Sequence, residues 1–163
     1  MVKFKSRIFL MFLFFGFIVI GSVYAQTDNR LNGRWTTTED GVELEYRFNN
    51  GNFEEFMMGG SSGRGTYTAI NGEITINHTH VHGGLFENMG LSGILESKWY
   101  SRNEAIIAIR AFFIELGFSE RDIIELVNQM LSNRTYNYSV DANSLILTGV
   151  IEGQSILLIF NKR

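Results

Sequence analysis

The fold is decided by one stretch of sequence, Val42-Glu-Leu-Glu-Tyr-Arg-Phe48, together with the Asn49-Asn-Gly-Asn52 that follows it. Apolar and charged side chains alternate along the first seven residues without an exception. A period of two is typical of a β-strand that buries one face. Because Asn and Gly readily adopt the positive φ angles of a tight turn, the chain is predicted to reverse here as a β-hairpin.

Similar short patterns lie on both sides of this hairpin. Asn71-Gly72 is another strong hairpin signal, and Glu152-Gly153 marks a further turn. We expect eight strands, at residues 34–38, 42–48, 53–58, 64–70, 73–82, 135–140, 145–148 and 155–160. All but one of the links are short, which favours antiparallel neighbours. A mainly β protein is therefore predicted, an eight-stranded antiparallel up-and-down barrel that closes on itself.

The exception is a helical insertion at residues 84–133. Ser101-Arg-Asn-Glu104 has the capping-box pattern of a helix start, and residues 105–116 form helices readily and are apolar almost all round. Gly117 suits a helix end, and Ser119-Glu-Arg-Asp122 opens a second helix that runs to about residue 131. Because the first helix is so apolar, we expect it to pack on the barrel as a lid over one end or to contact another protein.

Residues 1–25 have the composition of an export signal peptide. Lys3, Lys5 and Arg7 precede an uncharged apolar run at 8–20, and Val23-Tyr-Ala25 resembles a cleavage site before Gln26. We expect a secreted or periplasmic domain at residues 26–163. The alternative is an uncleaved anchor, which would be its only contact with a membrane.

Composition excludes several classes of function. The sequence has no cysteine, so lipid attachment after the signal, disulfides, thiol catalysis and cysteine metal sites are excluded. Removal of residues 1–25 leaves 11 basic and 17 acidic residues, a net charge of −6. Nucleic acid is not expected as a partner, because its recognition needs a positive face. No cofactor is indicated, and a monomer is expected.

The first predicted strand carries the motif Leu31-Asn-Gly-Arg-Trp35. Its Gly33 and Trp35 resemble the G-x-W motif of the lipocalins and related calycin barrels, and residues 31–82 and 135–163 are similar to small bacterial lipocalin-like domains. The resemblance implies that Trp35 plugs one end of the barrel under a basic residue, Lys162 or Arg163, of which we take Arg163. The helical insertion departs from that family, which puts the usual geometry of ligand binding in doubt at that side.

The leading hypothesis is an exported lipocalin-like protein that binds a small, largely apolar ligand. An eight-stranded barrel either holds one small ligand or fills itself with side chains. Seven side chains are expected on the inner faces, namely Tyr46, Phe48, Phe56, Met58, Tyr67, Tyr136 and Tyr138. The alternative is a solid barrel that serves as a structural or protein-interaction module through its helical insertion.

A second alternative is metal binding by His78, His80 and His82. On a regular strand these three side chains share one face, and two neighbours could hold one zinc, copper or nickel ion. A further ligand would come from elsewhere, with Glu45, Glu55, Glu73 and Glu87 as candidates. We expect no enzyme, because no nucleophile motif such as G-x-S-x-G is present.

Overall fold

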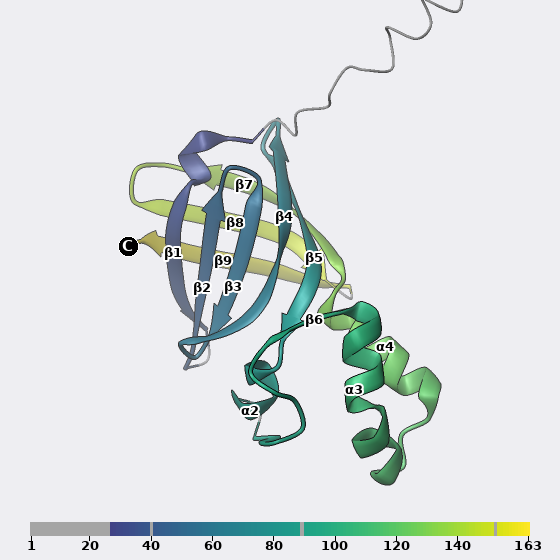
Figure 1. Cartoon of the computed structure of the whole chain (residues 1–163). Helices are drawn as coiled ribbons and strands as arrows, with labels where there is room; N and C mark the ends of the chain where they lie inside the picture. The colour runs from purple at the N-terminus through teal and green to yellow at the C-terminus, as the bar shows by residue number, and fades with distance from the viewer. Residues whose placement is uncertain (1–26, 40, 89, 152) are drawn as a thin grey trace, which may run out of the picture.

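A computed structural model describes residues 27–39, 41–88, 90–151 and 153–163. The main feature is a closed, eight-stranded antiparallel β-barrel (Figure 1). Its strands are β1 (Gly33–Glu39), β2 (Val42–Asn49), β3 (Asn52–Met57), β4 (Gly60–Ile70), β5 (Glu73–His82), β7 (Asn133–Val140), β8 (Ser144–Ile151) and β9 (Gln154–Lys162). The predicted barrel is confirmed, and each expected strand overlaps an observed one. The predicted signal peptide at 1–25 lies outside the described residues.

Pairing follows the order of the strands around the barrel. Each strand pairs with the next along the chain, except that β5 pairs directly with β7 across the insertion. β1 and β9 close the circle through Trp35 opposite Lys162 and Thr36 opposite Asn161. The tight turns have the expected conformation, with positive φ at Asn50-Gly51 and Asn71-Gly72.

Aromatic rings fill the barrel interior, in a core that extends to the end of the barrel where Leu31 lies. Tyr46 contacts Phe53 and Phe160 at ring-centroid distances of 5.1 and 4.8 Å, and Phe48 contacts Tyr67 at 4.8 Å. Aliphatic side chains complete this core, among them Leu31, Ile74, Ile76, Leu145 and Leu147. This end of the barrel is therefore packed solid with side chains.

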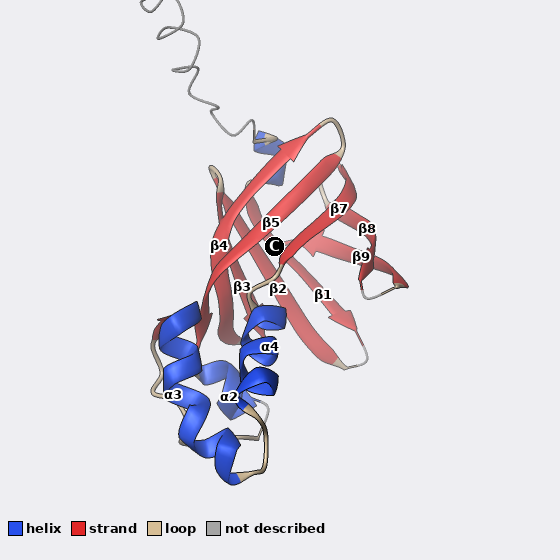
Figure 2. Cartoon of the chain, turned by 90° about the vertical axis from the view of Figure 1, so that its right-hand side faces the viewer, coloured by secondary structure: helices blue, strands red, loops and turns tan. Residues whose placement is uncertain are grey.

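The short 3-10 helix η1 (Asn29–Leu31) lies at the same end of the barrel (Figures 1 and 2). Trp35 is fully buried and donates a hydrogen bond from Nε1 to the Leu31 carbonyl oxygen, 2.6 Å away. The Lys162 ammonium lies 5.0 Å from the centre of its ring. Gly33 leaves room for this side chain, because a Cβ there would lie 3.1 Å from Lys162 Cε.

The basic residue over Trp35 is thus Lys162, and our choice of Arg163 is wrong. Residues paired across neighbouring strands point to the same side of a sheet, and Lys162 is the residue paired with Trp35. Arg163 follows the strand and reaches the outer surface, where it forms an ion pair of 3.0 Å with Glu43.

The insertion contains α2 (Gly84–Asn88), β6 (Trp99–Ser101), α3 (Arg102–Glu115) and α4 (Glu120–Met130). Both predicted helices are present, and both begin with capping boxes, the expected one at Ser101 and a second one at Ser119. The sequence did not reveal α2 and β6, because residues 85–100 follow neither the two-residue period of a strand nor the 3.6-residue period of a helix. Among the described residues, no helix is long and apolar enough to cross a membrane.

The helices lie beyond the end of the barrel opposite η1 (Figures 1 and 2). They form a second hydrophobic core around Ile109, Ile123 and Val127, which packs on Val81 of β5 and on Tyr100 of β6. We expected the first helix to pack on the barrel as a lid over one end. The helices instead form a separate layer with its own core, attached to the projecting end of β5. Ile107, the most exposed of its large apolar side chains, is 73% accessible to solvent.

Candidate functional site

A cluster of polar side chains lies inside the barrel, on the side of the aromatic core that is nearer to the insertion. Its central members are Glu55 of β3, His78 of β5 and Arg134 of β7. The side chain of His78 is only 2% exposed, that of Glu55 12% and that of Arg134 28%. Three charged or titratable side chains at such depth are unusual, because burial of a polar group costs free energy unless it is paired.

Two irregularities of the sheet lie next to this cluster. The register of β3 and β4 shifts after Glu55, so that Ser62 is left without a paired residue and its hydroxyl donates to Glu55 Oε2 at 3.2 Å. The register of β4 and β5 shifts next to Gly65, which leaves Thr79 as the extra residue. Such bulges turn the side chains that follow them toward a new direction.

His78 is held in one orientation by the end of the insertion. Its Nδ1 lies 3.1 Å from the Ser132 carbonyl oxygen, which can only accept, so Nδ1 carries the proton. Burial lowers the pKa of His78, and the nearby Glu55 carboxylate opposes this effect only in part. The ring is neutral at pH 7, and Nε2 is a hydrogen-bond acceptor.

That acceptor has no hydrogen-bond partner among the described residues, although it is fully buried. Glu55 Oε2, which is another acceptor, lies 3.9 Å away. On its other side Glu55 Oε1 lies 3.7 Å from Arg134 Nη1. Both distances exceed that of a direct hydrogen bond. The cluster therefore presents two acceptors and one guanidinium that are close together but not joined.

Two tyrosines complete the surroundings of the cluster. Burial raises the pKa of Tyr46 and that of Tyr136, so both hydroxyls stay protonated. Tyr136 packs beside Gly149, where a Cβ would lie 3.1 Å from its ring. The Tyr46 hydroxyl lies within hydrogen-bonding reach of Glu55, and the Tyr136 hydroxyl lies within reach of Arg134.

Five of the seven predicted lumen residues lie on the inner face. Tyr46, Phe48, Tyr67 and Tyr136 are buried, and Tyr138 is half-buried with its hydroxyl on Asp28 at 2.9 Å. The predictions for Phe56 and Met58 are wrong. Phe56 lies under the Arg47 guanidinium on the outer surface, and Met58 is 59% exposed in the turn after β3.

The expectation that His78, His80 and His82 share one face is wrong as well. The extra residue Thr79 reverses the alternation, so that Val81 rather than His80 is buried, and it packs in the second core with the helices. His80 instead contacts the Thr79 hydroxyl, and the ring of His82 packs against Trp99 at 4.8 Å. No group of three metal-ligating side chains occurs in the part of the chain that the structure describes.

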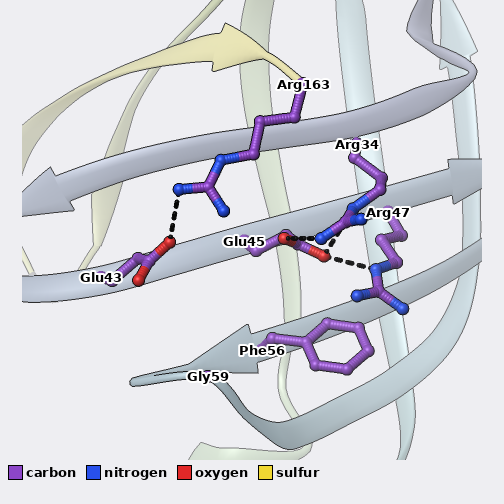
Figure 3. A pocket seen from close by; sticks show the side chains of 7 residues that line it. All are labelled: Arg34, Glu43, Glu45, Arg47, Phe56, Gly59 and Arg163. Atoms are coloured by element: carbon purple, nitrogen blue, oxygen red, sulfur yellow. Dashed lines mark hydrogen bonds and ion pairs between the residues drawn. The ribbon is translucent and has the colours of Figure 1, made fainter.

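A shallow hollow of about 190 Å³ lies on the outer surface of β1, β2 and β3 (Figure 3). Arg34 and Arg47 both converge there on Glu45, which is 9% exposed, while Arg163 pairs with Glu43. The hydrogen bond from Arg34 Nη2 to Glu45 Oε2 is 2.8 Å long. Because each carboxylate is already paired, this hollow is a network of ion pairs that joins neighbouring strands.

The depressed pKa of His78 predicts a pH dependence of stability. An unfolded chain takes up a proton at this histidine near pH 6.5, whereas the folded barrel resists protonation, so stability is lost as the pH falls below 6.5. We expect the free energy of unfolding to drop between pH 7.5 and pH 5.5 by more in the wild type than in His78→Gln. Urea titrations at the two pH values measure this, and an equal drop in both proteins would contradict it.

No protein-family model matches the sequence, and a search of curated proteins gives no match either. Among solved structures, the chain is similar to an uncharacterized protein from Bacteroides eggerthii DSM 20697. The two share 18% sequence identity with a TM-score of 0.41, and the alignment covers 82% of this chain and 99% of the other.

Proposed function

We propose that the protein binds a small molecule in the half of the barrel that faces the insertion, with a polar head on the cluster of Glu55, His78 and Arg134. The observation that carries this proposal is the buried, unpartnered Nε2 of His78. Buried polar atoms in folded proteins nearly always have a partner, so an exception marks a place where another molecule completes the structure. An apolar wall with a few convergent polar groups is also typical of a ligand site.

The surroundings of the cluster support a largely apolar body for the ligand. The ring of Phe53 meets His78 edge-on at 5.3 Å, and the half-buried Leu44 and Leu158 pack around the same core. Gly63 lies against the two acceptors, where a Cβ would approach His78 Cδ2 to 3.1 Å and Glu55 Oε2 to 3.2 Å. The partial exposure of Arg134 gives a route to the cluster from solvent.

The proposed role is binding rather than catalysis. From residues 1–25 we also propose that the protein works outside the cytoplasm. We further propose that it is a monomer. The rival role as a protein-interaction module rests on the apolar surface of the helices, where Ile107 and Leu116 are exposed. In that case the barrel would be only a support, and nothing would bind at His78.

Native mass spectrometry of the full chain, purified without denaturation from the cells that make it, tests the proposal. We expect a non-covalent small-molecule adduct on the wild type that is lost in His78→Leu. The matched control is His80→Ala, because His80 lies on the same strand but outside the lumen. An adduct-free wild type, or equal loss from both variants, would contradict binding at this site.

A further inference from the structure

From the charges and hydrogen-bonding capacities of the cluster, we infer that the head of the ligand is a neutral amide-type group, with an N–H donor beside a C=O acceptor. This inference rests on the proposed function, and it names the class of molecule that the site selects. Three properties of the cluster carry it: its balanced charge, the direction of its acceptors and the position of its only guanidinium.

The charge of the cluster is already balanced. Glu55 contributes one negative charge and Arg134 one positive charge, whereas His78 is neutral because burial lowers its pKa. A charged head would leave one uncompensated charge among buried side chains, which is strongly unfavourable in proteins. A neutral head keeps the balance, so both carboxylates and free amines are disfavoured.

The acceptors require a head that donates. His78 Nε2 and Glu55 Oε2 both offer lone pairs, and they lie 3.9 Å apart. A nitrogen with two hydrogens can donate to both atoms from a position between them. An ionised carboxylate has no hydrogen to donate, and it would meet two lone pairs at that position.

The guanidinium requires an acceptor on the same head. Arg134 Nη1 lies 3.7 Å from Glu55 Oε1, too far for a direct hydrogen bond, and its fork of N–H groups has donors to spare. A carbonyl oxygen attached to the donating nitrogen satisfies it. Primary amides and ureas combine these two functions in one planar group, whereas an ammonium ion has no acceptor.

The test compares three probes that share one apolar tail: hexanamide, hexanoate and hexylammonium. Isothermal titration calorimetry of the full chain at pH 7 gives their affinities, and the His78 imidazole ¹⁵N resonances report contact with Nε2. We expect hexanamide to bind at least about tenfold more tightly than either ion, which reflects the cost of burying an unpaired charge. We also expect hexanamide to shift the Nε2 resonance.

The variant Glu55→Gln adds a test of the charge argument. It keeps the shape of the side chain but leaves Arg134 uncompensated, so hexanoate should gain affinity while hexanamide loses it. Glu54→Gln is the matched control, because Glu54 is its exposed neighbour and should change neither affinity. Far-UV circular dichroism checks that both variants keep the strand signal of the barrel.

The outcomes separate the two proposals. If hexanoate or hexylammonium binds the wild type as tightly as hexanamide and shifts Nε2, the inferred head group is wrong and the binding site stands. If no probe shifts Nε2 and none binds, the binding site is overturned together with its head group. If Glu55→Gln leaves the order of affinities unchanged, charge balance does not set the selectivity and the inference is overturned.

Discussion

Replacement of Trp35 by alanine is expected to lower the free energy of unfolding by about 3–5 kcal/mol, the range found when a large buried aromatic side chain is removed. Trp35 is fully buried, and its indole nitrogen donates to the Leu31 carbonyl. The variant loses this packing, leaves the carbonyl without its donor and removes the ring under the Lys162 ammonium. Equilibrium denaturation in urea, followed by circular dichroism, measures the loss.

The matched control is Trp99→Ala, at the second tryptophan of the chain. Trp99 lies on β6, half-buried between His82 and the Arg64 guanidinium, outside the barrel core. Trp99→Ala should therefore lower the free energy of unfolding clearly less than Trp35→Ala does. Equal losses in the two variants would show that Trp35 does not stabilise the closed end of the barrel as the structure indicates.

Replacement of Gly65 by alanine is expected to destabilise the barrel by about 3 kcal/mol or more, at the upper end of the overpacking range. A Cβ at this position would lie 1.8 Å from the Asn77 carbonyl oxygen and 3.1 Å from His78 Cα. Both contacts involve backbone atoms, so the clash is relieved only if β4 and β5 separate. The melting temperature and the yield of soluble protein measure the effect.

Two other glycines of the same region serve as controls. Gly63→Ala brings a methyl group to 3.1 Å from a side-chain atom of His78, and Gly59→Ala meets nothing within 4 Å but has a φ of +80°. Both variants should lose less stability than Gly65→Ala. Gly63→Ala requires only a small shift of His78, and Gly59→Ala introduces backbone strain of about 1 kcal/mol. If Gly65→Ala were as stable as either control, the close approach of β4 and β5 would be wrong.

The sequence predicted the strands well where alternation and turn chemistry agree. Residues 42–48 alternate strictly and are bounded by Asn-Gly turns, so both the element and its inner face follow from the pattern. On β3 the pattern is ambiguous, because Phe53, Phe56, Met57 and Met58 are apolar on both parities. The inner parity predicted at Phe56 is wrong, because Glu55 and not Phe56 lies on the lumen side of β3.

The candidate site was predicted only in part. His78 was singled out, and Glu55 was named among four carboxylates as a candidate for a further metal ligand, but Arg134 was missed. A bulge depends on how two strands fit, so the extra residue at Thr79 is not visible in one strand alone. The available signal is Gly65, since a glycine inside a strand often marks a bulge or a close backbone approach.

The direct pairing of β5 with β7 has a consequence for how the chain tolerates change. Residues 73–77 face residues 133–137 in register, so the wall of the barrel is continuous without the helices between them. The segment from α2 to α4 is therefore an insertion in the connection between β5 and β7. It can diverge in length and sequence while the barrel wall stays intact. The backbone at Ser132 cannot diverge in the same way, because its carbonyl fixes the tautomer of His78.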